Sequence, residues 1–441
     1  MLSFLFRGAR TRTPRQGPVS RRRSFVPRLD VLEDRSLPST LTVTNLADSG
    51  RGSLRGQLAV ASPGDTIVFK PGLSGTIALG STLTLDRNVS VVGNLDAAGN
   101  ALVTLTSSGR DDSTDLAVNA GVTASVSGLT LTGATEAAVF NRGSLTLRRV
   151  AVTGNWIGYW GIFGDHTGTV YNAGGNLVVQ DSRINDNHLR GGSSGTHGGG
   201  GIESGTYVGT TGALSVANST VTNNDGGRAG GGIWISGGTA TITGSTITGN
   251  MVSGNGGGIG GNGTFTLTVA GCTISGNNAS VGGGIYVAGS GTAAVTDSTI
   301  SSNTAQSGGG IYFATRSAST LANSTVANNQ VIAYGRGGAG IFVADRSVAS
   351  VVNSTIAGNT TGSLTNGGGI YVASGSALFA GGTLTLLNST VARNQTAGAG
   401  GGLWVGQWRG DRGQRHDHAD GHRFHDLGQQ RQYRRRHLRC R

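Results

Sequence analysis

The chain has 441 residues, of which 80 are glycine, 13% are charged and 5% are aromatic. This much glycine disfavours helices, six prolines without a Gly-X-Y period exclude collagen, and no apolar run reaches the ~18 residues of a membrane-spanning helix. The net charge of +12 lies at the ends, with nine Arg against three acidic residues in 1–36 and ten against four in 405–441. The neutral body argues against nucleic-acid binding, which needs a basic stripe on the folded part.

Two repeated motifs dominate the body. One motif ends in Asn and is given in full below as the first motif. The other, the second motif, is G-G-G-I followed in most copies by an aromatic residue; it comes after each copy of the first, and its central copies recur every 26 residues. Between them, short segments alternate apolar with small polar residues and are separated by Gly and Asn clusters. The first motif, (N/D/G)-(S/C)-T-(I/V)-x-x-N, ends at Asn224, Asn250, Asn277, Asn303, Asn329, Asn359 and Asn394.

Three short strands and three turns per unit describe one coil of a parallel β-helix, in which coils stack about 4.8 Å apart and contact only their neighbours. We therefore predict an all-β fold, a single-stranded right-handed parallel β-helix (a solenoid) of about a dozen coils and roughly 60 Å in length. Repeated residues then lie above one another. The seven asparagines are expected to form a structural ladder, and the repeated Ile and Val to fill the interior.

The composition divides the chain into four parts, which are named at the end of this paragraph. The second part, an N-terminal cap, is expected to hold one amphipathic helix, SLRGQLAVA, whose N-cap is Ser53. The first inner strand is expected at Asp65–Phe69. Cys272 stands where sister repeats place Ser, so we interpret it as a small buried residue outside any disulfide framework. The parts are a disordered basic leader, an N-terminal cap, the β-helix and a disordered basic tail, with bounds 1–40, 41–64, 65–405 and 406–441.

The tail departs abruptly from the repeat and holds five of the eight histidines. Read out of frame, the codons for 423–441 permit GSTISGNNASTGGGIFAA, which agrees with residues 271–288 at 14 of 18 positions. We therefore interpret the tail as a frameshift product that begins near Gly406, so that the intact product is expected to continue past 441. The alternatives are a basic disordered tail and a His-rich metal site.

Three segments resemble bacterial families. Residues 41–93 resemble the opening of right-handed β-helix proteins of the CSLREA type, through V-T-N (43–45), D-S-G (48–50), G-S-L-R (52–55) and G-D-T-I (64–67). The repeats in 218–404 resemble those of polymorphic outer membrane proteins. FVPRLDVLEDRSLPST (25–40) resembles the Arg-rich leader of planctomycete surface and secreted proteins. These resemblances imply an exported β-helix, extracellular or at the cell surface and outer membrane, of the kind found in adhesins and autotransporters.

An aromatic residue follows most copies of G-G-G-I. If Ile points inward, the next side chain points outward, so stacked coils would present an aromatic stripe, which suits sugar rings and partner proteins. We therefore predict a binding or adhesion module for glycans or surface proteins, without a cofactor or metal. A structural stack that shields coil edges and a passive surface stalk are the alternatives. The stripe, interrupted by Gly260, comprises Trp234, Tyr286, Tyr312, Phe342, Tyr371 and Trp404.

The repeat lengthens between residues 156 and 203, and insertions in a solenoid form loops that often lie on the binding face. Trp156 and Trp160 are predicted to contact a ligand there, and Asp165, His166 and Glu203 are the candidates for acid–base catalysis. On this second hypothesis the protein is a polysaccharide lyase or a glycoside hydrolase. An ordinary inserted loop that packs its own aromatic side chains is the simplest account of these residues, and among functional roles we expect binding rather than catalysis.

Overall fold

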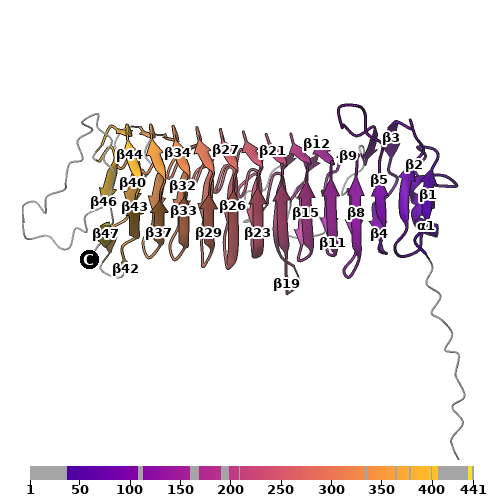
Figure 1. The fold of residues 1–441 in the computed structure, drawn as a ribbon, viewed down its shortest axis with the longest axis horizontal. Coiled ribbons are helices and arrows are strands. Elements are labelled where there is room, and N and C mark those ends of the chain that lie inside the picture. The colour runs from indigo at the N-terminus through magenta and orange to yellow at the C-terminus, as the bar shows by residue number, and fades with distance from the viewer. Residues whose placement is uncertain are drawn as a thin grey trace, which may run out of the picture. The chain divides into compact units, whose positions relative to one another are not determined.

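The computed structural model describes residues 37–405, except 108–112, 159–167, 190–197, 208, 333–335, 363–364, 377–378 and 399, together with residues 436–439. The chain separates into two units, Met1–Leu37 and Pro38–Arg441, and every described element lies in the second. Its short strands wind into a right-handed parallel β-helix of about 11 turns. Figure 1 shows equivalent strands side by side, with colours in chain order along the row of coils. The predicted fold class is confirmed.

Sheet A, the first of three long sheets, has 14 strands, and each strand pairs in register with its equivalent in the next coil. All of its pairs are parallel except the last. Its strands are β1 (Thr40–Val43), β2 (Thr66–Phe69), β5 (Ser90–Val92), β8 (Thr123–Ser127), β11 (Ser144–Arg148), β15 (Asn176–Gln180), β20 (Ala213–Ala217), β23 (Gly238–Thr243), β26 (Phe265–Ala270), β29 (Thr292–Thr296), β33 (Ala318–Ala322), β37 (Val348–Val352), β43 (Thr383–Leu387) and β47 (Arg436–Arg439).

Sheet B has 12 strands, and its central residue is a buried Ile or Val in every coil from Thr220 to Ala357. This alternation of outward Thr and inward Ile is the period-2 pattern of the first motif. Its strands are β3 (Gly75–Ala78), β6 (Val103–Thr106), β9 (Leu129–Thr132), β12 (Ala151–Thr153), β16 (Arg183–Asn185), β21 (Thr220–Thr222), β24 (Thr246–Thr248), β27 (Thr273–Ser275), β30 (Thr299–Ser301), β34 (Thr325–Ala327), β38 (Thr355–Ala357) and β44 (Thr390–Ala392).

Sheet C has 13 strands, and the Ile of the G-G-G-I motif begins most of them and is fully buried. One of its members, β19 (Thr210–Thr211), pairs antiparallel with β18. The other strands are β4 (Leu83–Leu85), β7 (Thr114–Val118), β10 (Ala137–Asn141), β14 (Val170–Ala173), β18 (Ile202–Tyr207), β22 (Ile233–Ile235), β25 (Ile259–Gly261), β28 (Ile285–Val287), β32 (Ile311–Phe313), β36 (Ile341–Val343), β40 (Ile370–Val372) and β46 (Leu403–Val405).

A fourth, shorter ladder lies in the chain between sheets B and C in the coils from Trp156 onward. It consists of two-residue strands joined by the isolated bridges Asp225–Met251 and Met251–Asn278 and their neighbours. A separate hairpin is formed by β41 (Gly375–Ser376) and β42 (Phe379–Ala380). The strands of the fourth ladder are β13 (Trp156–Ile157), β17 (His188–Leu189), β31 (Thr304–Ala305), β35 (Gln330–Val331), β39 (Thr360–Thr361) and β45 (Gln395–Thr396).

The N-terminal end of the β-helix is covered by the helix α1 (Leu54–Val60). The Ser53 hydroxyl accepts a hydrogen bond from the Gly56 N–H at 3.0 Å, which satisfies one of the free donors of the first turn. Leu54 and Leu58 face the core. The predicted cap helix is therefore confirmed. None of the helices among the described residues has the length and apolar character needed to cross a membrane.

Two left-handed corners bracket the strand of sheet B in each coil, which explains the first and sixth positions of the first motif. Gly, Asn and Asp tolerate this backbone better than other residues. The corner before the strand is formed by Arg149, Asp181, Asn218, Gly244, Gly271, Asp297, Asn323, Asn353 and Asn388. The corner after it is formed by Gly154, Asp186, Asn223, Gly249, Gly276, Ser302, Asn328, Gly358 and Arg393.

The residue after the second corner is a buried asparagine. Each of these side chains donates from Nδ2 to Oδ1 of the next asparagine at 2.8–3.0 Å. The same Oδ1 also accepts from the backbone N–H of the preceding asparagine. The ladder thus satisfies the buried polar groups of this corner. It contains Asn155, Asn187, Asn224, Asn250, Asn277, Asn303, Asn329, Asn359 and Asn394, and so begins two coils earlier than the close copies of the motif.

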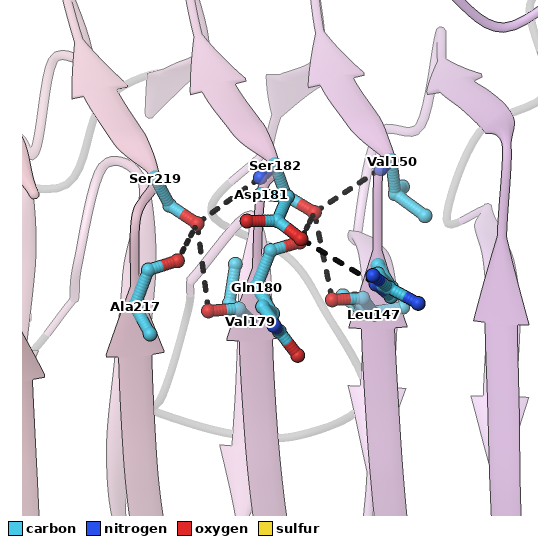
Figure 2. A network of polar contacts seen from close by, with 9 residues as sticks. Leu147, Val150, Val179, Gln180, Asp181, Ser182, Ala217 and Ser219 are labelled. Carbon is cyan, nitrogen blue, oxygen red and sulfur yellow. Dashed lines mark hydrogen bonds and ion pairs between the residues drawn. The ribbon is translucent and has the colours of Figure 1, made fainter. Parts of the chain in front are cut away.

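A second polar ladder follows the first corner, and Figure 2 shows part of it. The Ser182 N–H donates to the Ser219 hydroxyl at 3.1 Å, and the Ser219 hydroxyl donates to the Ala217 carbonyl at 2.7 Å. The pattern repeats in later coils, where the Cys272 N–H donates to the Ser298 hydroxyl at 3.1 Å. Cys272 is buried, as expected, and its sulfur occupies the place of a serine hydroxyl.

The C-terminal end carries one strand from the segment expected to be disordered. β47 pairs antiparallel with β43, with Leu438 opposite Leu384. Residues 436–439 of this segment thus form a described strand, and the open edge of β43 supplies its backbone partners. The rest of the tail and the leader lie outside the described residues.

Candidate functional site

The predicted aromatic stripe is a row in register on sheet C. Tyr286 lies opposite Tyr312, Tyr312 opposite Phe342, and Phe342 opposite Tyr371, which in turn lies opposite Trp404. The side chains are held there because each follows an inward Ile of the G-G-G-I motif or, for Trp404, the equivalent Leu403. The row begins before the first copy of the motif, since Phe140 and Tyr171 follow inward valines and precede Glu203 in the same row.

The rings of this row stack on one another. The Tyr312 and Phe342 centroids lie 4.5 Å apart with planes 3° apart, and the Phe342 and Tyr371 centroids lie 4.8 Å apart with planes 8° apart. Phe342 is 1% exposed, and burial raises the pKa of Tyr312 to about 12. Ring faces that pack on neighbouring rings are not available to a sugar, so the row offers a ligand its edges.

Gly260 does not leave a gap in the row. A Cβ atom at Gly260 would lie 2.6 Å from the Trp234 ring, so the indole of Trp234 extends over the glycine into the next coil. Trp234 is 2% exposed as a result. The stripe was expected to present exposed aromatic faces, and for Trp234 and Phe342 this is wrong because neighbouring rings and backbone cover them. The binding role predicted for the stripe stays a prediction.

Glu203 lies in the same row, on β18, with Tyr171 and Trp234 as its register neighbours. It is fully buried. Its fellow candidates Asp165 and His166, and the ligand candidate Trp160, lie outside the described residues. The structure does place Trp156, but on the fourth ladder and not on sheet C, so Trp156 and Glu203 belong to different faces of the coil.

Trp156 forms an exposed aromatic platform with His188. The two residues are paired in register on β13 and β17, and their ring centroids lie 4.4 Å apart with planes 29° apart. Trp156 is 47% exposed. An exposed indole held against a second ring is a preformed surface for an apolar or sugar ring, because its orientation is fixed before a ligand arrives.

A groove of about 480 Å³ continues from this platform along the fourth ladder. Sequence analysis missed it, because its residues occupy the variable positions between the ladder asparagine and G-G-G-I. Their only sequence signal is apolar side chains at exposed positions: Met251 is 53% and Ile332 44% exposed. The groove is lined by Leu189, Asp225, Gly227, Met251, Val252, Ser253, Asn278, Ala279, Ser280, Gln306 and Ile332.

The groove has two walls and a floor. Asp225, Met251 and Asn278 pair in one column and form the first wall. The buried side chains of Val252 and Ala279, each one residue later, form the floor. The described part of the chain holds no group of three or more His, Cys, Asp or Glu side chains that could bind a metal.

The second wall is polar and is built by loop backbone. The Ser253 N–H donates to the Gly227 carbonyl at 2.8 Å, and the Ser253 hydroxyl donates to that same carbonyl. The Ser280 hydroxyl donates to the Gln306 side-chain oxygen at 3.4 Å. Hydroxyl and amide groups therefore face the groove opposite Asp225 and Asn278.

Comparisons with known proteins agree with the fold. The family model for the right-handed β-helix region matches residues 204–391, and a search of curated proteins finds no match. Tailspike protein 3 of bacteriophage CBA120 is similar in structure, with a TM-score of 0.43 and 12% identity over 81% of this chain and 58% of the tailspike. This chain thus spans little more than half of that protein.

Two further solved structures are similar in the same way. PfbA, a surface adhesin of Streptococcus pneumoniae, has a TM-score of 0.35 and 11% identity, over 81% of this chain and 91% of its own. A polygalacturonase from Erwinia carotovora has a TM-score of 0.29 and 10% identity, over 86% of this chain and 100% of its own. These likenesses concern the fold alone.

Proposed function

We propose that this protein is an exported β-helix that binds a glycan along the face of the fourth ladder. The observation that carries the proposal is the groove that runs on from the exposed Trp156–His188 platform. Carbohydrate sites combine a ring surface for the apolar face of a sugar with a few fixed polar groups for its hydroxyls. The platform supplies the first, and Asn278 and Gln306 supply the second.

The rest of the surface supports this choice of face. In the central coils, the outer sides of sheets A and B are formed mainly by Thr, Ser and Ala in register, which offer few large apolar contacts and little charge. The aromatic row of sheet C is stacked on itself. The fourth ladder carries three of the exposed large apolar side chains, Trp156, Met251 and Ile332.

The proposed location is outside the cell or on its surface. The resemblance of residues 25–40 to an Arg-rich leader supports export, and the neutral Ser/Thr faces suit a protein that displays one binding face along a stiff rod. An antibody against the β-helix should label intact cells of the source organism. Labelling that requires permeabilised cells would contradict the proposed location.

Binding is tested by calorimetry of the full chain with a panel of oligosaccharides. We expect Trp156→Ala combined with Asn278→Ala to weaken the tightest ligand about tenfold or more, since each lost contact contributes about 1 kcal/mol. Thr268→Ala, on the outer face of β26 in sheet A, is the matched control and should leave affinity unchanged. Equal loss in all variants, or no binding by any oligosaccharide, would contradict the proposal.

A second function is favoured by one observation, the burial of the Glu203 carboxylate in an otherwise aromatic row. A Glu carboxyl group can serve as the acid or base of a polysaccharide lyase or glycoside hydrolase. Release of reducing ends or unsaturated products from polysaccharides by the full chain, abolished by Glu203→Gln, would support this function. Turnover that survives Glu203→Gln would exclude Glu203 as its acid or base.

A further inference from the structure

The groove has a direction and a length set by the β-helix. The first wall holds three of the lining residues and the second wall four, and successive coils supply the lining from Leu189 at one end to Ile332 at the other. These two residues belong to coils five steps apart, so the groove extends over roughly 24 Å at the usual strand spacing. A ligand that fills it must therefore be extended and must lie parallel to the axis of the β-helix.

The lining residues that lie furthest apart along the axis, Leu189 and Ile332, are both apolar, and the floor between them is made of the smaller Val252 and Ala279. Met251 stands between Asp225 and Asn278 on the first wall. Apolar contacts and hydrogen-bonding groups thus alternate along the length, which matches a chain whose units each carry apolar C–H faces and equatorial hydroxyls.

The charge of the lining selects among such chains. Asp225 is the one charged side chain among the described residues that line the groove, and its carboxylate accepts a hydrogen bond from the Gly227 N–H at 3.2 Å. None of these described lining residues is Lys, Arg or His. An acidic sugar placed beside Asp225 would lose hydration and would be repelled by its carboxylate.

We infer that the groove binds an uncharged glycan, extended along the axis at about one sugar unit per coil, and rejects chains of uronic acids. This inference rests on the proposed glycan-binding function and names the class of glycan. Asp225 is a specificity-determining residue here: it accepts hydrogen bonds from sugar hydroxyls and excludes carboxylated chains. Ser280 and Gln306 on the second wall hydrogen-bond the opposite edge of the chain.

The experiment compares two length series on the immobilised full chain by biolayer interferometry. One series is neutral β-linked hexose oligomers of two to six units, and the other is hexuronic acid oligomers of the same lengths. Affinity for the neutral series should rise with length and level off at about five units, the number of coil steps along the groove. Each acidic oligomer should bind about tenfold more weakly than its neutral counterpart, equivalent to about 1.4 kcal/mol.

Three variants test which residues cause the preference for neutral oligomers. Asp225→Asn keeps the shape of the side chain but removes its charge, and should raise affinity for the acidic series about fivefold relative to the neutral series. Ser280→Ala with Gln306→Ala should weaken the neutral series about tenfold. Thr268→Ala is the control on the opposite sheet and should change neither series.

The outcomes separate this inference from the function on which it rests. Acidic oligomers that bind as tightly as neutral ones, or affinity that stops rising at two units, would overturn the inference while leaving the protein a glycan-binding one. An unchanged acidic series in Asp225→Asn would also overturn it. Failure of every oligosaccharide to bind, or capture of an uncharged extended peptide instead, would overturn both.

Discussion

The carboxylate of Asp115 is buried at a position that later coils fill with smaller side chains. Asp115 lies on β7, and the equivalent residues in the next three coils are Ala138, Thr169 and Gly201. Asp115 is 0% exposed, and the hydrogen bonds that Ser107 offers to its carboxylate only partly oppose the effect of burial. Burial is the main cause that raises the pKa of Asp115 to about 7.

Asp115 should therefore make stability depend on pH. The unfolded chain, with a pKa of 3.8, releases this proton before the folded chain does, so the contribution to stability is full below pH 3.8 and is lost as pH rises through about 7. The loss amounts to at most roughly 4 kcal/mol. We expect urea midpoints to fall between pH 4 and 7.5, and to fall less in Asp115→Asn. Parallel pH curves for the two proteins would contradict this account.

Cys272 weakens the serine ladder at one rung. The Ser245 backbone N–H meets its sulfur, which is a poorer acceptor than an oxygen, and the sulfur donates to the Ala270 carbonyl at 3.3 Å. Cys272→Ser should raise the free energy of unfolding by about 0.5–1.5 kcal/mol, measured by urea denaturation. Ser298→Cys is the reciprocal control and should lower it. Changes of the same sign in both variants would show that the ladder contributes little.

At the scale of the element, the corners that bracket sheet B limit which residues a coil accepts. Ser302 occupies the corner after β30 with φ of 56°, where equivalent coils carry Gly, Asn or Asp in most cases. Ser302→Gly should stabilise the protein by about 1 kcal/mol, because a β-carbon is unfavourable in this conformation. Ser301→Gly, one residue earlier in the strand, should destabilise it by a similar amount. Urea midpoints measure both, and stabilisation by both would contradict the argument.

The same elements show what sequence could predict. The first motif specifies two corners, two ladders and one strand at fixed positions, so its period determines the stacking and the Asn224–Asn394 ladder. The aromatic row was found from its position after Ile285 and its equivalents, yet its burial depends on backbone folded against it. A Cβ atom at Gly282, for example, would lie 2.8 Å from Cβ of Tyr286. Periodicity carries no information about such contacts.

The groove could not be predicted from the sequence for a different reason. Its walls come from one residue per coil at positions where residue type and loop length vary, as with Met251, Asn278 and Gln306. Adjacent wall residues are 26 or 27 positions apart in the chain, so no local pattern marks them. Only the register of the coils brings Asp225, Met251 and Asn278 into one column. The same register places Trp156 on β13 opposite His188 on β17.

At the scale of the whole molecule, each coil is stabilised by contacts with its neighbouring coils, and solubility depends on how the two end coils are covered. The first coil is closed by α1, where Leu54 and Leu58 join the core. At the other end Val391, Leu403 and Val405 pack against the core but stay partly exposed. Of the three long sheets, sheet A ends in the antiparallel pair of β43 with β47.

The pairing of β47 should therefore protect the molecule from self-association, since an unpaired edge strand recruits other chains. Leu438→Pro removes a backbone donor from β47 and should increase concentration-dependent association in sedimentation velocity, as should deletion of 436–441. His437→Ala leaves the backbone intact and is the control. A tail that is only a frameshift product, without a structural role, would leave all of these proteins equally monomeric. The experiment thus decides between the sequence interpretation of the tail and the strand that the structure places on β43.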